Sequence, residues 1–170
     1  MILTYLKRAG SLPPATLNIS EVAFAGVVDA TQLYQQQAAQ AGLTLQINRA
    51  PSDGYWSNVW MKEPFSGSYS AGRATPDLML TSAYHSSAAW NDTHFKREEF
   101  DNLLAAARAE QNEEKRRQMY HDMQVIIQEQ GGTILPVFNN YIFAGSEKVN
   151  GFGMSPVFSG MRVAEQLYFA

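Results

Sequence analysis

The chain has 170 residues, of which 45% are hydrophobic and 12% aromatic, which is enough apolar material for one core and argues against extended disorder. Its formal net charge is -3, and no run of lysine or arginine is longer than Arg116-Arg117, which argues against a surface for nucleic acid or an anionic membrane. The sequence has no cysteine for a disulfide framework and no apolar window of roughly 18 residues for a membrane span.

The first ten residues have the pattern of the end of an amphipathic helix. Leu3 and Leu6 are followed by two basic residues and Gly10, the usual order at a helix carboxyl end. The segment lacks the apolar stretch and the cleavage pattern of a signal peptide. We therefore expect the chain to belong to a longer protein whose signal peptide lies outside this sequence.

Residues 16–48 predict a strand, a helix and a second strand. The run TLNI is prone to β-structure, and Asp29 stands where a helix N-cap is expected, before an apolar stripe that ends at Gly42. Residues 43–48, LTLQIN, then alternate apolar and polar side chains with the period of a strand. Such a unit usually forms parallel neighbours joined by a right-handed crossover.

A short helix is predicted after Gly54, with Trp56 and Trp60 four residues apart on one face. Two interpretations remain open for these tryptophans. Large aromatic side chains usually pack in a core, here under the sheet, whereas a tryptophan at the edge of a cleft can form a wall against a ligand.

The stretch 64–91 is predicted to hold a ligand-binding loop. It begins with a strand-like piece, residues 65–69, continues through small residues, and returns to helical spacing at Pro76-Asp77, where proline suits a first helical turn. A strand that ends in small residues before a helix is a common support for a binding loop.

Two helices are predicted after Asn91, with apolar faces around Phe100 and Met123 and with Asn112 as the cap of the second. Their charged residues are expected on a solvated outer face. Gly131-Gly132 should end the second helix, and residues 133–138, TILPVF, predict a buried strand that residues 141–144 continue. From Asn150 onward the periodicity is weak and aromatic residues look exposed, as expected for a segment that packs on another part of a protein.

The sequence gives little support for catalysis or for a metal site. The three histidines, His85, His94 and His121, lack the spacing of a helical metal pair. No serine lies in a Gly-x-Ser-x-Gly elbow. We expect no enzymatic activity, no cofactor and no bound metal.

The motifs taken in order resemble the C-terminal portion of the family 5 extracellular solute-binding proteins, the peptide, opine and nickel receptors of bacterial ABC importers. The resemblance covers essentially the whole chain, and the combination is more specific than any one piece. The matching segments are Asp53-Gly54-Tyr55-Trp56, Gly72-Arg73-Ala74-Thr75-Pro76-Asp77, Trp90-Asn91-Asp92, Glu114-x-Arg116-x-x-x-Tyr120 and Pro136-Val137-Phe138-Asn139-Asn140-Tyr141.

The resemblance implies an α/β fold, the C-terminal lobe of a type II periplasmic-binding-protein fold with a mixed sheet flanked by helices. Residues 1–138 would form most of that lobe, and residues 139–170 would cross toward the missing N-terminal lobe and pack on it. The whole protein would be periplasmic, would close on its ligand by a hinge motion between lobes and would then dock on ABC permease subunits. Self-association of the truncated lobe through its exposed aromatic residues is a further expectation.

In the peptide-binding relatives, the loop equivalent to residues 69–77 commonly carries an aspartate that pairs with the peptide α-ammonium. This sequence departs from the pattern, because the loop offers Arg73 and its acid, Asp77, lies at the helix start. A guanidinium favours a carboxylate or a phosphate, and the Gly-Arg-x-Thr order resembles the subgroup that includes opine receptors. Arg73 could equally pair with Asp77 or Asp92 and only fix the turn.

Trp90 can stack on a ligand and Asn91 can donate and accept hydrogen bonds, or the pair can cap the region that follows. Asn139 and Asn140 could line the cleft or form an asparagine turn. The ligand-binding residues that we expect are Trp56, Tyr69, Ser70, Arg73, Trp90, Asn91, Asn139, Asn140 and Tyr141.

The sequence therefore predicts a fragment of the substrate-binding component of a bacterial ABC importer. Its expected ligand is an oligopeptide or an opine-like small polar solute, and this solute can be anionic. Two alternatives remain. One is a protein-interaction module built on the apolar tail. The other is a hydrolase or transferase that uses Asp77, Asp92 or a histidine as a base, and a carboxylate of raised pKa in a closed pocket would favour it.

Overall fold

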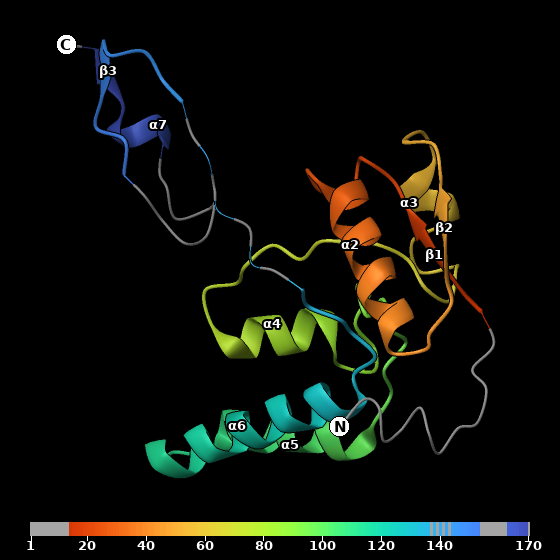
Figure 1. Ribbon diagram of the computed structural model, residues 1–170. Helices are drawn as coiled ribbons and strands as arrows, with labels where there is room; N and C mark the ends of the chain where they lie inside the picture. Colours follow the sequence, from red (N-terminus) through yellow and green to blue (C-terminus); the bar gives the residue numbers. More distant parts are fainter. Residues whose placement is uncertain are drawn as a thin grey trace. The chain divides into compact units, whose positions relative to one another are not determined.

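The computed structural model describes residues 14–136, 138, 140, 142, 144–153 and 163–169, so the predicted helix end at the N-terminus lies outside it. The chain divides into two compact units, Met1–Ser70 and Ala71–Ala170, and their elements are labelled in Figure 1. Among the described residues, no helix combines the length and the apolar character needed to cross a membrane.

The first unit contains the predicted strand, helix and strand. Strand β1, Ala15–Ile19, pairs in parallel with β2, Leu45–Arg49, and helix α2, Val27–Gln40, connects them. The register runs from Ala15 opposite Leu45 to Ile19 opposite Arg49, so both strands end at the same edge. After the helix, Gly42 has φ +85°, a left-handed conformation that glycine adopts without strain.

The start of α2 differs from the prediction. Gly26, at φ +82°, is the N-cap, and Asp29 lies in the first turn without capping it. Glycine at this position lets the chain turn into the helix three residues earlier than expected, and the negative charge of the Asp29 carboxylate is still favourable near the positive end of the helix dipole.

The core of the first unit lies between the strands and α2. Ile19 and Val27 are fully buried there, and Phe65 packs against them at the edge. The predicted strand at 65–69 appears as a single parallel bridge from Ser66 to Asn18 on the other edge of β1, with the Asn18 amide donating to the Phe65 carbonyl over 3.0 Å.

Helix α3, Tyr55–Asn58, brings Tyr55 beneath that edge. Tyr55 is fully buried, and its hydroxyl donates to the Gly67 carbonyl over 2.6 Å. Burial raises the pKa of Tyr55 above its ordinary value, and the hydrogen bond to Gly67 offsets only part of the shift. The residue that packs under the sheet is therefore Tyr55, while Trp56 and Trp60 are half-buried.

The second unit is built on three helices: α4, Pro76–Ala83; α5, Glu98–Ala109; and α6, Glu113–Gln130. Pro76 occupies the first turn of α4 as predicted, and the Thr75 hydroxyl caps this helix by accepting from the Leu78 amide. The predicted cap of α6 is confirmed, since the Asn112 side chain accepts from the Lys115 amide over 3.0 Å. The helix ends before Gly131-Gly132, also as predicted.

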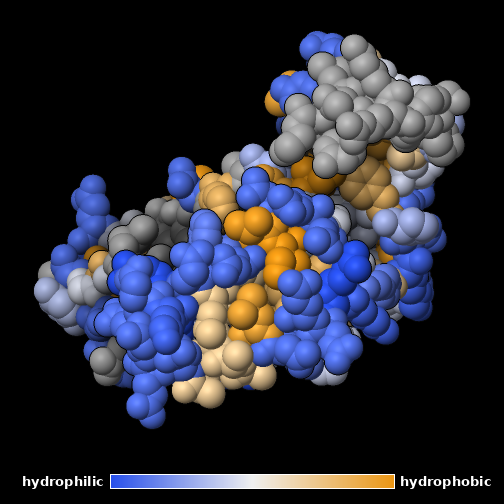
Figure 2. All heavy atoms as spheres, turned by 90° about the horizontal axis from the view of Figure 1, so that it is seen from below, coloured by the Kyte–Doolittle hydropathy of each residue, from blue (hydrophilic) through white to orange (hydrophobic). Residues whose placement is uncertain are grey.

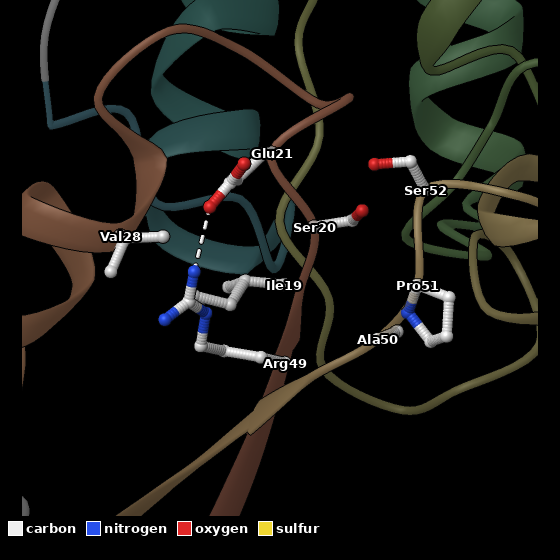
Figure 3. A pocket seen from close by; sticks show the side chains of 8 residues that line it. All are labelled: Ile19, Ser20, Glu21, Val28, Arg49, Ala50, Pro51 and Ser52. Atoms are coloured by element: carbon white, nitrogen blue, oxygen red, sulfur yellow. Dashed lines mark hydrogen bonds and ion pairs between the residues drawn. The ribbon is translucent and has the colours of Figure 1, made fainter.

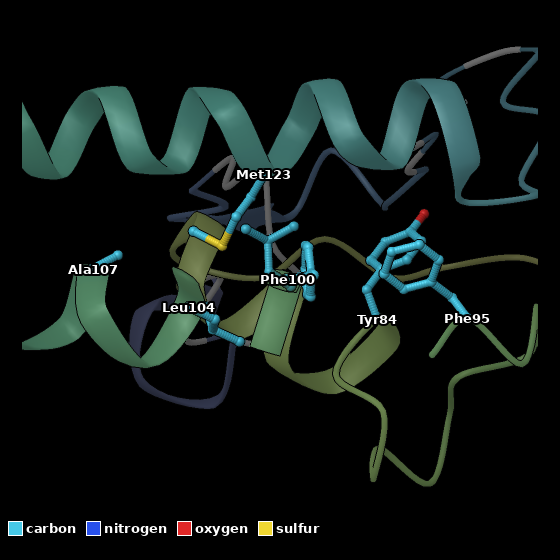
Figure 4. Close-up of a cluster of buried hydrophobic side chains, with 7 residues drawn as sticks. Tyr84, Phe95, Phe100, Leu104, Ala107 and Met123 are labelled. Carbon is cyan, nitrogen blue, oxygen red and sulfur yellow. The ribbon is translucent and has the colours of Figure 1, made fainter. Parts of the chain in front are cut away.

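Interdigitating apolar side chains hold α4, α5 and α6 together (Figure 4). Phe100 and Leu104 of α5 and Met123 of α6 are fully buried, and Phe95 meets Phe100 edge to face with ring centroids 5.3 Å apart. Most charged side chains of α5 and α6 are exposed, as predicted. Figure 2, which views the molecule from below, shows orange hydrophobic surface flanked by blue hydrophilic side chains.

The predicted strand at 133–138 is wrong for the residues that the structure describes. Residues 133–136 and Phe138 form no strand, and the side chains of Leu135 and Phe138 are 65% and 89% exposed. Pro136 cannot donate to a ladder, and the apolar run lacks a neighbouring strand in the described part of the unit. The predicted continuation over 141–144 is also absent at Ile142 and Ala144, while Tyr141 and Phe143 lie outside the described residues.

The tail contains an unpredicted pair of short strands. Strand β3, Val149–Asn150, pairs antiparallel with β4, Tyr168–Phe169, after helix α7, Val163–Gln166. The expected exposure is confirmed for Phe152, Tyr168 and Phe169. The prediction for Phe158 falls outside the described residues.

Candidate functional site

The expected ligand-binding residues fall in both units. Trp56, Tyr69 and Ser70 belong to the first, and Arg73, Trp90, Asn91 and Asn140 belong to the second. Asn139 and Tyr141 lie outside the described residues.

In the first unit, Trp56 lies at the centre of an aromatic group. Its ring meets Tyr55, Trp60 and Tyr69 edge to face, with centroid distances of 5.3, 5.7 and 5.6 Å. Tyr55 is the buried anchor, whereas Tyr69 is 61% exposed. Trp56 thus connects the core to the exposed ring of Tyr69. This position is compatible with the interpretation that Trp56 forms a wall against a ligand. Ser70 next to Tyr69 is exposed.

In the second unit, the guanidinium of Arg73 lies over the indole of Trp90, 5.5 Å from the ring centroid. Its Nη1 also donates to the Ala71 carbonyl over 2.9 Å. The contact with the ring face is a cation–π interaction, which orients the guanidinium while leaving in-plane N–H donors for another acceptor. Trp90 is itself 56% exposed. The structure therefore brings together two of the residues expected to bind a ligand.

Asn91 has a structural role in the same loop. It is buried, and its side-chain amide donates to the carbonyls of Phe95, over 2.5 Å, and His85, over 3.3 Å. Its carbonyl accepts from the Phe95 amide and from the Thr93 hydroxyl. Both donors and both lone pairs are thus used within the loop, which favours the interpretation that Asn91 fixes the backbone here. Asn140 is exposed, and its contact with a ligand stays a prediction.

One of the alternatives left open for Arg73 was a pairing with Asp77, and the structure shows a different ion pair at this carboxylate. Arg108 of α5 donates to both carboxylate oxygens of Asp77, over 2.7 and 3.1 Å, and also to the Thr81 hydroxyl. The Tyr120 hydroxyl of α6 donates to Asp77 over 3.0 Å, so this carboxylate joins all three helices.

These contacts shift the pKa values of Asp77 and Tyr120 in opposite directions. The hydrogen bond from Arg108 is the largest cause that lowers the pKa of Asp77, and burial is the largest cause that raises the pKa of Tyr120. The raised pKa that would favour the hydrolase alternative is not found at Asp77, whose pKa is lowered. Among the residues that the structure describes, no group of three or more histidine, cysteine or acidic side chains could hold a metal ion.

A pocket of about 320 Å³ lies where β1 and β2 end, and the sequence prediction did not identify it (Figure 3). Ser20 and Glu21 follow β1, and Ser52 lies just beyond β2. In open α/β sheets, ligands bind outside the carboxyl ends of the strands. The signal was present in the sequence, since both predicted strands are followed by polar residues.

Comparisons with known proteins identify the fold. No family model and no curated protein sequence matches the chain. Among solved structures, AppA from Clostridium difficile has 18% identity and a TM-score of 0.74 over 99% of this chain, and 36% of AppA is covered. The periplasmic binding protein DppA from Helicobacter pylori, associated with an ABC transporter and in complex with the peptide STSA, has 18% identity and a TM-score of 0.71; 98% of this chain and 33% of DppA are covered.

A third similar structure is the nickel ABC transporter protein from Bacillus halodurans, with 18% identity and a TM-score of 0.58; 76% of this chain and 30% of that protein are covered. The chain thus spans about a third of the length of these proteins. The resemblance to the family 5 solute-binding proteins is confirmed at the level of the fold: the chain has the α/β fold of one part of the ABC-transporter binding proteins for peptides and nickel.

Proposed function

We propose that the chain is part of the substrate-binding component of a bacterial ABC importer and forms one wall of a ligand cleft that a second lobe completes. The observation that carries the proposal is the likeness to ABC-transporter binding proteins over 98–99% of the chain. A fold by itself admits many functions, so the residues of the chain must supply the ligand chemistry.

Arg73 supplies a preference for an anionic group. Cation–π contact with Trp90 holds the guanidinium in place, and its remaining donors match a carboxylate or phosphate of the solute. An opine-like solute, or the carboxylate of an oligopeptide, has such a group. The receptor works in the periplasm with ABC permease subunits, and residues 139–170 pack on the second lobe.

The test is substitution of Arg73 in the full-length receptor. Native mass spectrometry of the receptor purified from its own periplasm identifies the bound solute by mass, and calorimetric titration then measures its affinity. We expect Arg73→Ala to weaken an anionic solute by about tenfold, while the melting temperature stays nearly unchanged because the side chain lies half-exposed on a loop.

Two further variants define the outcome. Arg73→Lys keeps the charge without the planar fork and should bind with intermediate affinity. Arg108→Ala is the matched control, since it breaks the contact with Asp77 and should lower the melting temperature without a direct effect on the solute. Equal titrations for Arg73→Ala and the parent would show that Arg73 does not contact the solute.

The interaction-module alternative depends on apolar residues that remain exposed near the end of the chain. A second lobe accounts for the same residues, because the binding proteins of similar fold are about three times longer. We therefore treat self-association as a property of the chain in isolation.

A further inference from the structure

One buried side chain connects the two ends of the loop, residues 84–97, that joins α4 to α5. Asn91 is 4% exposed, and its amide donates to the carbonyl of His85 near the start of the loop and to the carbonyl of Phe95 near its end. Its own carbonyl accepts from the Phe95 amide over 3.0 Å. A buried amide whose partners all lie in one loop fixes the backbone on both sides of it.

Both ends of the loop are attached to α5. Phe95 is buried in the helical core, where its ring meets Phe100 of α5 edge to face (Figure 4). At the other end, the Ser86 amide donates to the Asp101 carboxylate of α5 over 3.1 Å. The loop therefore has a rigid frame, and Asn91 connects this frame to the middle of the loop.

Trp90 directly precedes Asn91 and has little packing of its own. Its side chain is 56% exposed, so contacts with neighbours restrain the indole only in part. The direction in which the indole leaves the loop is set by the backbone that Asn91 fixes. The guanidinium of Arg73 lies over this indole, 5.5 Å from the ring centroid, and Arg73 itself comes from a half-exposed stretch before α4. The position of the guanidinium thus depends on the position of the ring.

We propose that Asn91 is a positioning residue that fixes the direction of Trp90 and, through the indole, the guanidinium of Arg73. The inference rests on the proposed function, in which Arg73 contacts an anionic solute. Both donors of Asn91 are used inside the loop, so its effect on a solute passes through Trp90 and Arg73. Such preorganisation raises affinity, because the binding group is already ordered before the solute arrives.

The first experiment needs no solute and uses NMR of the 170-residue chain. Protons that lie over the face of an aromatic ring shift upfield, because the ring current opposes the applied field there. We expect the side-chain protons of Arg73 to show this shift, with Trp90→Ala as the reference that lacks the ring. Asn91→Ala should lose most of the shift. Asn102→Ala, at an exposed asparagine of α5, is the matched control and should keep it.

A second variant separates positioning from loss of the fold, because Asn91 is buried and its truncation also lowers stability. Asn91→Asp has the same shape and keeps an acceptor for the Phe95 amide, but its carboxylate cannot donate to the carbonyls of His85 and Phe95. We expect a ring-current shift between those of the parent and Asn91→Ala. Loss of positioning should move the signals of Arg73 and Trp90 and leave the methyl signals of the helical core in place, whereas unfolding would collapse them all.

The second experiment measures the effect on binding in the full-length receptor. The titrants are the solute that native mass spectrometry identifies in the receptor and, as a defined carboxylate, trialanine. Asn91→Ala should weaken each titrant that binds by about fivefold, and by no more than Arg73→Ala does. In a receptor that already carries Arg73→Ala, the further change should be less than about twofold, because the residue through which Asn91 acts is gone. A purely structural role of Asn91 would give the same loss in both receptors.

An unchanged ring-current shift of Arg73 in Asn91→Ala and Asn91→Asp, or an equal loss of affinity in both receptors, would overturn the inference. Failure of the proposed function gives a different pattern. If Arg73→Ala binds the solute as the parent does, the role of Arg73 in binding fails, and the ring-current shift still decides whether Asn91 positions it. If Arg73→Ala weakens the solute while Asn91→Ala changes neither the shift nor the affinity, the proposed function stands and the positioning inference fails.

Discussion

At the scale of single residues, the Asp77 carboxylate of α4 accepts hydrogen bonds from two other helices, from Arg108 of α5 and from Tyr120 of α6. Its pKa is lower in the folded chain than in the unfolded one, chiefly because of Arg108. Such a carboxylate stabilises the fold fully at pH values above the pKa that it has in the unfolded chain, about 3.9. This stabilisation is lost as the pH falls through the lower pKa that the carboxylate has in the folded chain.

We therefore expect Asp77→Asn to lower the free energy of unfolding by about 1 kcal/mol at pH 7, a modest value because Arg108 is half-exposed. The difference from the parent should shrink as the pH falls below about 4, because the parent carboxylate then also loses its charge. Urea unfolding followed by circular dichroism at several pH values measures this difference in the free energy of unfolding. An equal difference at pH 3 and pH 7 would contradict the role of the charge.

Asp122 provides the control. It is an exposed carboxylate on α6 that accepts a hydrogen bond from Gln118 over 2.7 Å. Asp122→Asn removes one negative charge from the same unit without a contact between helices. We expect it to change stability at pH 7 far less than Asp77→Asn does.

The contacts of Asp77 show why the sequence predicts residues less well than helices. Asp77 and Arg108 are 31 positions apart, and their pairing depends on how α4 packs on α5. From the sequence, the partner of Arg73 is left open between a ligand, Asp77 and Asp92, and in the structure Arg108 takes Asp77. The sequence likewise does not tell which aromatic residue of α3 packs beneath the sheet, because the buried face of a one-turn helix depends on distant partners, here Gly67 and Asn18.

At the scale of elements, local signals predicted the helices well. Pro76 marks the start of α4, Asn112 caps α6, and apolar spacing defines the buried faces of α5 and α6. These signals act over one or two helical turns, so they can be recognised in the sequence without knowledge of the tertiary structure. The run at 133–138 has the composition of a strand, yet a strand also needs a neighbour for its backbone, and no local pattern supplies that.

The cap of α6 leads to a prediction for this element. Asn112→Ala removes the acceptor for the Lys115 amide and should destabilise the second unit by about 1 kcal/mol. Gln111→Ala, one position earlier and also exposed, is the matched control with no cap to lose. Thermal unfolding of the two variants and the parent checks this. A loss of stability in Gln111→Ala equal to that in Asn112→Ala would contradict the cap as the cause.

At the scale of the whole molecule, the first unit and the helices of the second have their own cores, whereas the segment after α6 presents apolar side chains to solvent. Ile134, Leu135, Phe138 and Ile142 are all at least half exposed. Four large apolar side chains within nine positions exceed the scattered exposure that is normal for a monomeric surface. A second lobe that covers them is part of the proposed function.

This surface gives a prediction for the chain in isolation. We expect the 170-residue chain to self-associate as its concentration rises, and Leu135→Ser combined with Ile142→Ser to shift the equilibrium toward monomer by removing apolar contacts. Sedimentation velocity across a dilution series measures this. Leu33→Ser, at an exposed leucine on α2, is the control and should leave association unchanged, because a single exposed leucine is ordinary on a protein surface. A parent chain that stays monomeric at every concentration would show that residues 134–142 need no covering partner.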